Sequence, residues 1–302
     1  MTGPSSISET LAELQTATLA SAALASALRD ERAGTPAEAL ALDPARAAAL
    51  AALPDPESML SVLWNDRGSR AGGLVSGLNQ AAAAASGTVR AWSDLGDDVM
   101  IAQGRASALM ARVILTTVAP AYGRSGDDAP TQVLDVGTGI GAIATALAVA
   151  LPAAEIVGID IAERPLAIAR DLLREVDPSV AGRIRLRRED VTELVDEASY
   201  DLVWMPLPFL PDAIVDRALD RVLRALRPGG LLVLGTLPAV EDERLRAATA
   251  WLASLSGGGS LIATDVIDRL ARRGLQRIEQ FATVPGAPVL VAAVLPDATT
   301  AE

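Results

Sequence analysis

The run VLDVGTGIGA at residues 133–142 constrains the fold of this chain more than any other feature of its sequence. A short apolar strand ends at Asp135, and Gly137, Gly139 and Gly141 then punctuate the turn into an apolar helix. Glycine has no Cβ, so its backbone can approach a ligand closely, and a helix N-terminus favours polar or anionic groups. The run also satisfies the glycine pattern of dinucleotide-binding folds, so on its own it leaves the kind of nucleotide open.

Two further acidic residues follow the next two predicted strands. The run EIVGIDIA places Asp160 at the end of the second strand, 25 residues after Asp135. A carboxylate there can accept hydrogen bonds from ribose hydroxyls in either kind of nucleotide site. The run RLRREDVTEL then places Asp190 and Val191 after a third strand. Because a dinucleotide fold gives no reason to expect an acid at that third position, the set favours a different nucleoside ligand.

The chain changes character near residue 123. Residues 6 to about 118 show helix signals one after another, including a capping box of Ser6 and Glu9. Three further helix starts carry proline at the first helical position, at Thr35-Pro36, Asp43-Pro44 and Asp55-Pro56. After a polar loop at 123–131, short runs rich in Val, Ile and Leu alternate with helical segments, which predicts a parallel sheet with helices on both faces. The last apolar runs, around VPGAP, predict a terminal hairpin, and SGGGS at 256–260 predicts a flexible turn between two helices.

Taken together, residues 133–235 resemble the class I S-adenosylmethionine (SAM)-dependent methyltransferases. VLDVGTGIGA resembles the first motif of that family, Asp160 the second and EDV at 189–191 the third. YDLVWMPLPF at 200–209 resembles the fourth motif, and LRPGGLLVLG at 226–235 resembles the signature of the fifth strand. The resemblance implies a Rossmann-like α/β fold of seven mostly parallel strands, the last antiparallel, preceded here by an all-helical region. It also implies SAM as the cofactor.

The resemblance assigns roles to individual residues. Asp135 would lie near the methionyl amino group, with Gly137, Thr138 and Gly139 passing under the ligand. Asp160 would accept from the ribose hydroxyls, and Ile161 would flank the adenine. Asp190 would accept from the adenine amino group, and the backbone N–H of Val191 would meet the ring. Similar enzymes close a helix over the methionyl end, and AQGRAS at 102–107 makes Gln103 the candidate for that contact.

The fourth motif departs from one branch of the family. Enzymes that methylate amide or ring nitrogens often carry Asn/Asp-Pro-Pro-Tyr/Phe there, whereas this chain has Pro206-Leu207-Pro208-Phe209. Trp204, Pro208 and Phe209 are therefore candidates for an apolar pocket wall, and no catalytic residue is assigned. Trp204 fits a core position equally well. Trp92 is interpreted as a packing residue that could instead belong to a substrate lid.

The composition narrows the chemistry. The chain has no His, Lys or Cys, so it has no imidazole base, no Schiff-base lysine and no thiolate or imidazole metal site. We expect no metal. The net charge of −12, without a basic stripe, argues against a nucleic-acid partner. No apolar tract appears long enough to span a membrane, and the first residues lack signal-peptide features, so a cytoplasmic protein is expected.

The resulting hypothesis is a methyltransferase acting on an O, N or C nucleophile of a small molecule, in biosynthesis such as secondary metabolism. Residues 1–122 would form a helical cap or oligomerisation region, through which the chain could form a homodimer, and 123–302 the SAM-binding domain. One alternative is an enzyme that cleaves another C–S bond of SAM, such as a cyclase that forms azetidine-2-carboxylate and releases methylthioadenosine. The other is a binding or assembly protein that retains SAM, or an NAD-linked fold, against which Asp190 and LRPGG argue.

Overall fold

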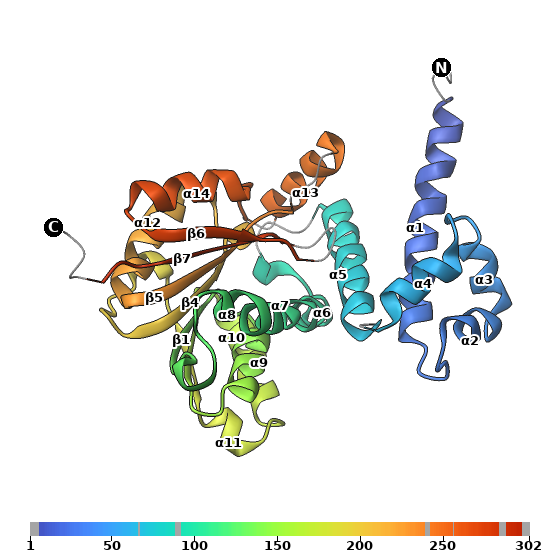
Figure 1. The fold of residues 1–302 in the computed structure, drawn as a ribbon. Helices are drawn as coiled ribbons and strands as arrows, with labels where there is room; N and C mark the ends of the chain where they lie inside the picture. The colour runs from blue at the N-terminus through green and yellow to red at the C-terminus, as the bar shows by residue number, and fades with distance from the viewer. Residues whose placement is uncertain are drawn as a thin grey trace. The chain divides into compact units, whose positions relative to one another are not determined.

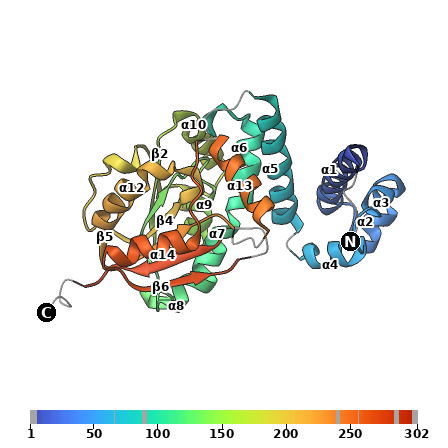
Figure 2. The same cartoon turned by 90° about the horizontal axis from the view of Figure 1, so that it is seen from above.

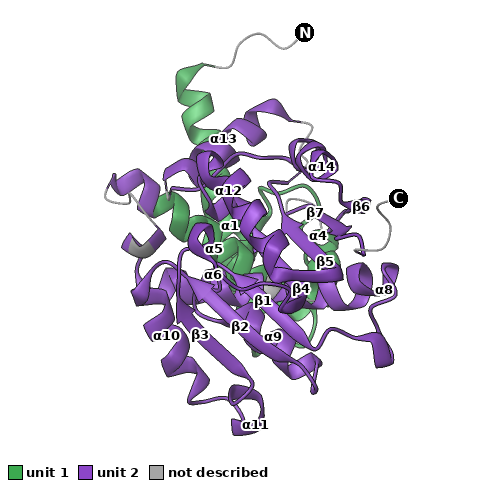
Figure 3. Ribbon diagram, turned by 90° about the vertical axis from the view of Figure 1, so that its left-hand side faces the viewer, with its two compact units in different colours: residues 1–82 green, residues 83–302 purple. Residues whose placement is uncertain are grey.

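The computed structural model describes residues 6–65, 67–87, 92–238, 242–255, 257–283 and 288–297 of the chain. The chain forms two compact units, residues 1–82 and 83–302 (Figure 3). This division falls earlier than the expected boundary at residue 122. The reason is that Met110, Ile114 and Val118 are buried in one core with the first strand, so the helices before that strand belong to the sheet unit.

The first unit is entirely helical in its described part, as predicted (Figure 1). Its helices are α1 (Ile7–Arg29), α2 (Pro36–Ala41), α3 (Pro44–Leu50), α4 (Pro56–Trp64) and α5 (Arg67–Ser86), the last of which runs past the unit boundary. The capping box of Ser6 and Glu9 is confirmed, and Thr35, Asp43 and Asp55 cap the next three helices as expected. The core of this unit is built from small and aliphatic side chains, among them Leu24, Leu28, Leu50 and Leu60.

The second unit contains the predicted seven-stranded sheet, in the order β3-β2-β1-β4-β5-β7-β6. The strands are β1 (Gln132–Val136), β2 (Glu155–Asp160), β3 (Ile184–Arg188), β4 (Tyr200–Pro206), β5 (Leu226–Gly235), β6 (Gln276–Phe281) and β7 (Leu290–Val294). The pairs from β3 through β5 are parallel, whereas β7 is antiparallel to both β5 and β6. The antiparallel β6–β7 pair confirms the terminal hairpin strands, and residues 284–287 of the VPGAP connection lie outside the described residues.

Helices cover both faces of this sheet (Figure 2). The helical segments of this unit are η1 (Trp92–Asp94), α6 (Asp97–Ser107), α7 (Leu109–Val113), the π-helical turn η2 (Ile114–Val118), α8 (Ala119–Ala121), η3 (Gly126–Asp128), α9 (Ala142–Ala150), α10 (Glu163–Leu173), α11 (Pro178–Ala181), η4 (Val191–Glu193), η5 (Leu207–Phe209), α12 (Asp212–Ala225), α13 (Glu243–Leu255) and α14 (Ala263–Arg272). Successive strand residues alternate between two cores. Val133 and Leu202 pack with α7–α9, whereas their neighbours Leu134 and Val203 pack with α12 and α14, as expected for strands buried on both faces.

Two helical stretches, Ile7–Arg29 and Asp97–Ala121, are long and apolar enough to cross a membrane by length and mean hydropathy alone, which the sequence analysis did not expect. Such matches are weak evidence, because core helices pass the same test. Both stretches contribute to a core of their own unit, the first through Leu24 and Leu28 and the second through Ile114 and Val118.

Candidate cofactor site

The glycine run forms the turn from β1 to α9. Gly137, Gly139 and Gly141 have φ angles of 66°, 55° and 74°, in the left-handed region that side chains with a Cβ rarely adopt. The turn is tied to the next strand, since the Thr138 N–H donates to the Ile159 carbonyl at 3.0 Å. Gly141 is the N-cap of α9, so the helix begins directly at the edge of the sheet. The local structure is therefore the strand, turn and helix that the sequence predicted.

Asp135 lies near the end of β1, just before this turn, and its carboxyl group is buried. Its Oδ2 accepts a 2.6 Å hydrogen bond from the Thr138 hydroxyl, and its Oδ1 has no partner among the described residues. Burial raises the pKa of Asp135 to about 7, and the nearby charge of Asp160 adds to the rise. The Thr138 hydroxyl opposes it, as does the Ala144 amide, which lies near without completing a hydrogen bond. A buried carboxylate oxygen without a partner is costly unless a ligand supplies one, so this atom fits a cationic donor.

Asp160 connects the glycine turn to the end of β2. Its Oδ2 accepts from the Gly139 N–H at 2.9 Å, and its Oδ1 accepts from the Ala162 N–H at 2.8 Å. Burial raises the pKa of this carboxyl group, and the two backbone hydrogen bonds oppose that rise. A carboxylate has about four acceptor positions, so the two that remain fit the hydroxyls of a ribose. Ile161, next in the chain, is 65% exposed, as a residue that contacts a ligand ring would be in the free protein.

Asp190 follows β3 as the sequence predicted, and its side chain also forms a hydrogen bond with the backbone nearby. Its Oδ1 accepts from the Thr192 N–H at 2.8 Å and caps the short helix η4. Val191 is buried in the core on the α12 side of the sheet. Because β1, β2 and β3 are adjacent and parallel, Asp135, Asp160 and Asp190 follow the carboxyl ends of three neighbouring strands, where open α/β sheets bind their ligands.

The helix α6 lies against the glycine turn. A Cβ on Gly104 would be 2.4 Å from the Ile140 side chain, so the glycine allows close contact between helix and turn. Gln103 precedes that glycine, and its Nε2 donates to the Ser107 hydroxyl at 3.1 Å. The helix that carries Gln103 therefore lies at the glycine turn. The Gln103 side chain itself is hydrogen-bonded to Ser107 within the same helix. Neither Gly104 nor its contact Ile140 was singled out from the sequence, although the glycine inside a helical pattern was a signal for close packing.

A second unpredicted contact holds Thr138 in place. A Cβ on Gly158 of β2 would be 2.7 Å from the Thr138 hydroxyl oxygen. Glycine at this position therefore makes room for the side chain that donates to Asp135. The sequence signal was a glycine within an otherwise apolar strand, which often marks close approach of another group.

Within the fourth motif, Trp204 and Phe209 lie in different environments. Trp204 is 2% exposed and packs in the core on the α9 side, where its ring lies against Gly235. This favours the core interpretation of Trp204 over the pocket interpretation. Phe209, in contrast, is 41% exposed and meets Trp92 edge to face, with ring centroids 5.2 Å apart at 72°. Trp92 also packs with the cluster that contains Ile140 of the glycine turn, so it is in contact with both sides of the site.

The loop of Pro208 is held from behind by the glycine segment before α14. A Cβ on Gly258 would be 1.9 Å from the Pro208 carbonyl oxygen, and one on Gly259 would be 2.1 Å from Asp212 Oδ1. The Asp212 carboxylate accepts from the Ser260 N–H and hydroxyl. Gly258 and Gly259 are therefore closely packed within the segment between α13 and α14, where the sequence predicted a turn between two helices. On the other side, a Cβ on Gly137 would lie 3.9 Å from Pro206, so the glycine turn and the fourth motif adjoin.

No three His, Cys, Asp or Glu side chains of the described residues form a group that could hold a metal ion.

Comparison with known proteins gives consistent matches. Residues 133–230 match the methyltransferase-domain family. The chain is 34% identical over 120 residues to malonyl-[acyl-carrier protein] O-methyltransferase of Methylococcus capsulatus, covering 39% of this chain and 42% of that protein. It is 28% identical over 151 residues to release factor glutamine methyltransferase of Rhodopirellula baltica, covering 50% of this chain and 49% of that protein. The chain therefore spans half or less of the length of these curated relatives.

A solved methyltransferase structure is among those similar to nearly the whole chain. It is the S-adenosylmethionine-dependent methyltransferase SibL in its apo form, with a TM-score of 0.62, 17% sequence identity, and coverage of 94% of this chain and 96% of that one. At this identity the similarity establishes a common fold.

Proposed function

We propose that this chain, whose sheet unit belongs to the class I SAM-dependent methyltransferases, transfers the methyl group of SAM to a small-molecule acceptor. SAM is the cofactor of this family, and the residues at the strand ends fit it. The single observation that carries the proposal is the linked set Asp135, Thr138, Gly139 and Asp160. It combines a buried carboxylate oxygen that has no partner among the described residues with a second carboxylate that is hydrogen-bonded to the glycine turn.

Each residue of the set has a defined task in this proposal. Asp135 would accept from the methionyl ammonium group through its Oδ1, and Asp160 would accept from the ribose hydroxyls. Ile161 would flank the adenine, whereas Asp190 and Val191 would meet its edge. Gln103, on the helix that packs against the turn, would close over the methionyl end. Bound SAM would supply a methyl group already activated by its sulfonium, so the protein has to position the acceptor and exclude water.

The chain has few side chains that could act as a general base, and the structure excludes two of them. With no histidine, lysine or cysteine, the two tyrosines were the remaining candidates apart from carboxylates. The Tyr122 hydroxyl donates to backbone carbonyls of β6 and β7, and burial raises its pKa to about 12. The Tyr200 hydroxyl donates to Asp196 at 2.5 Å, and burial raises its pKa as well. Neither tyrosine is suited to accept a proton, which leaves carboxylates, water or an acceptor that needs no base.

The fourth motif supports an apolar acceptor over a protein amide. Pro206-Leu207-Pro208-Phe209 lacks the Asn or Asp that orients an amide nitrogen in related enzymes, so the activity in the name of the release factor relative is not expected here. The exposed edge of Phe209 and the neighbouring Trp92 instead offer an aromatic wall beside the glycine turn.

The arginines of the sheet unit support a small molecule over a nucleic acid. In the basic run at 183–188, Arg183 donates to carbonyl oxygens at the end of α9, and Arg187 pairs with Asp196 and Glu189. These side chains are engaged within the protein, and the chain carries a net charge of −12. Phosphate contacts supply most of the affinity for nucleic acids, so a structured RNA is a poor candidate acceptor.

The test is an incubation of the full chain with SAM and a library of small metabolites, with mass spectrometry of the products. The proposal expects S-adenosylhomocysteine to accumulate only with certain acceptors, together with an acceptor heavier by one methylene. Methylthioadenosine formed without any acceptor would overturn methyl transfer in favour of the cyclase alternative. Failure to bind SAM, with binding of NAD instead, would overturn both.

A further inference from the structure

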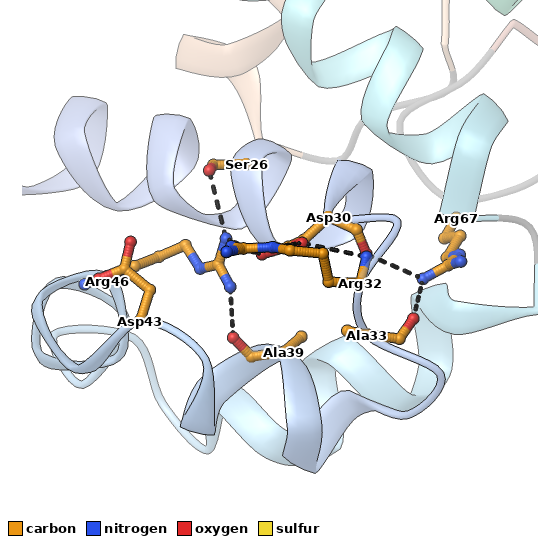
Figure 4. Close-up of polar contacts among 8 residues, drawn as sticks. All are labelled: Ser26, Asp30, Arg32, Ala33, Ala39, Asp43, Arg46 and Arg67. Carbon is orange, nitrogen blue, oxygen red and sulfur yellow. Dashed lines mark hydrogen bonds and ion pairs between the residues drawn. The ribbon is translucent and has the colours of Figure 1, made fainter.

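The helical unit contains a cavity of about 590 Å³ that is lined by residues of α1, α3 and α5 and of the turn after α1. Three of the five arginines in residues 1–82 line it, namely Arg29, Arg32 and Arg46. Figure 4 shows Arg32 and Arg46 with their polar contacts. The same unit carries nine acidic residues, so it is acidic as a whole while this cavity gathers its cations. This distribution needs an explanation, because like charges are not brought together without a compensating interaction.

Two aspartates in the cavity account for only part of that charge. The Asp30 carboxylate accepts from Arg32 at 2.7 and 2.8 Å and from Arg46 at 3.1 Å, so two arginines share one acid. The Asp43 carboxylate accepts from the backbone N–H of Arg46 and caps α3, which is a task within the backbone. Three arginines thus face two carboxylates, and the cavity keeps an excess positive charge.

The ion pair of Asp30 and Arg46 has a structural role, but it does not use all the hydrogen-bond donors of Arg46. It joins the end of α1 to α3, and Arg46 also donates to the Ala39 carbonyl. The Arg46 side chain is only 7% exposed, yet its Nε has no partner among the described residues. The Arg29 side chain likewise has no hydrogen bond or ion pair to any described residue, and it is exposed at the cavity. The buried Nε of Arg46 without a described partner indicates a missing acceptor, and Arg29 adds an exposed cation at the same cavity.

The remaining wall is partly apolar, with Ser26 and Asn79 as its uncharged polar residues. Ala22 and Ala25 of α1 and Val75 and Leu78 of α5 line the cavity alongside the arginines. A volume of about 590 Å³ is within the range of sites for small organic molecules. A bare inorganic ion would leave this apolar surface uncovered, whereas a molecule with an apolar body would cover it.

We propose that this cavity binds a small organic anion, an apolar body that carries one carboxylate or phosphate group. Arg29 and Arg46 hold the anionic group, since guanidinium N–H donors match the oxygens of both groups. Val75 and Leu78 contact the apolar body. The site lies within the helical unit, and the proposal does not rest on the proposed methyl transfer.

The experiment is isothermal titration of the full chain with three probes that share one ring: benzoate, phenyl phosphate and neutral benzamide. We expect benzoate, phenyl phosphate or both to bind with a stoichiometry of one, and benzamide to bind at least about tenfold more weakly because it lacks the charge. Binding of only one anion identifies which anionic group the site prefers. Equal binding of benzamide and benzoate, or no binding of either anion up to millimolar concentrations, overturns the proposal.

Matched variants assign the binding to this cavity. Arg29→Gln removes an exposed cation and is expected to weaken the anion by about tenfold or more while the circular dichroism spectrum is unchanged. Arg46→Lys keeps a cation beside Asp30 but removes the Nε donor, and it should weaken binding as well. The control is Arg272→Gln, which makes the same charge change on the exposed surface of α14 and should leave binding unchanged. Unchanged binding in Arg29→Gln and Arg46→Lys contradicts the assignment.

Discussion

The Thr138 hydroxyl donates a 2.6 Å hydrogen bond to Oδ2 of the buried Asp135 and leaves the other carboxylate oxygen without a described partner. The bond fixes the carboxylate plane at the end of β1, so the free oxygen has a defined position before any ligand arrives. A donor that reaches it gains a charge-assisted hydrogen bond with little reorganisation.

Replacing Asp135 with Asn should therefore weaken the binding of S-adenosylhomocysteine. A hydrogen bond to a charged group contributes about 1.5 to 3 kcal/mol, which corresponds to roughly a 10- to 100-fold loss of affinity. Calorimetry near neutral pH measures the loss. An affinity equal to that of the unmodified protein would remove Asp135 from the contact with the methionyl ammonium group.

Because the pKa of Asp135 is raised, ligand affinity and protein stability should change in opposite directions as the pH rises. Since the pKa is about 7, affinity for S-adenosylhomocysteine should rise as the carboxyl group ionises between about pH 6 and pH 8, and the Asn variant should lack that rise. For stability without ligand, the contribution of a group with a raised folded pKa is fully present below its unfolded pKa of 3.8 and is lost as pH rises through about 7. Asp135→Asn should thus melt higher than the unmodified protein at about pH 8, and the difference should shrink at about pH 5.

Asp160→Ala should weaken SAM by roughly 1.5 to 3 kcal/mol, because it removes a charged acceptor for the ribose and also frees the Gly139 and Ala162 amides. The matched control is Asp171→Ala, which removes an exposed carboxylate from α10. Calorimetry with SAM compares the two variants. If both bind SAM as the unmodified protein does, Asp160 has no part in ribose recognition.

Gly158→Ala tests the packing that holds Thr138. The added methyl group would lie 2.7 Å from the Thr138 hydroxyl oxygen and 3.0 Å from Leu186, and such overpacking typically costs about 1 to 3 kcal/mol. We expect a lower melting temperature together with weaker S-adenosylhomocysteine binding. Gly73→Ala is the control, since it lies in α5 with nothing within 4 Å of the added Cβ and should raise the stability of the helix. A Gly158→Ala protein with normal stability and affinity contradicts the packing argument.

The sequence was sufficient to predict where the carboxylates at the strand ends lie, but not which side chains contact each other around them. Asp135 and Asp160 each end a predicted strand, and parallel strands bring their carboxyl ends to one edge of a sheet, so their proximity follows from the pattern alone. Trp204 also lies on a strand, but which face it occupies depends on the packing of α7–α9, and the sequence left its core and pocket interpretations open. The pairing of Trp92 with Phe209 joins segments far apart in the chain, so no local pattern could predict it.

The unit boundary shows the same limit. Helix signals continue from residue 6 to about residue 118, and a helix that packs on a sheet has the same local pattern as one that packs on another helix. The division at residue 82 depends on tertiary contacts such as those of Met110 and Ile114 with the core around β1.

The N-terminal turns of α1 lead to a prediction about self-association, which we propose as a role for the helical unit. Ile7, Leu11 and Leu14 are 81%, 60% and 60% exposed and are spaced four and three residues apart, so they form one apolar stripe. Most of the stability of a helix in a protein comes from packing of an apolar face, and this stripe is exposed in the single chain. Leu11→Glu with Leu14→Glu should shift a homodimer to monomer in light scattering, whereas Val62→Glu on α4 should not. A monomer at all concentrations for the unmodified chain contradicts this role.

The last prediction concerns the aromatic pair beside the glycine turn. If Phe209 and Trp92 form the acceptor wall, Phe209→Ala and Trp92→Ala should each raise the acceptor KM while leaving SAM affinity unchanged. Because the rings meet edge to face, the two effects should be coupled, and aromatic pairs show coupling of about 0.5 to 1.5 kcal/mol in double-mutant cycles. The double variant should therefore lose less than the two single losses added together. Trp251→Ala, which removes an exposed ring from α13, is the control. Equal KM values in all variants would show that the acceptor is bound elsewhere, whereas weaker SAM binding in Trp92→Ala would show that the ring supports the glycine turn through Ile140.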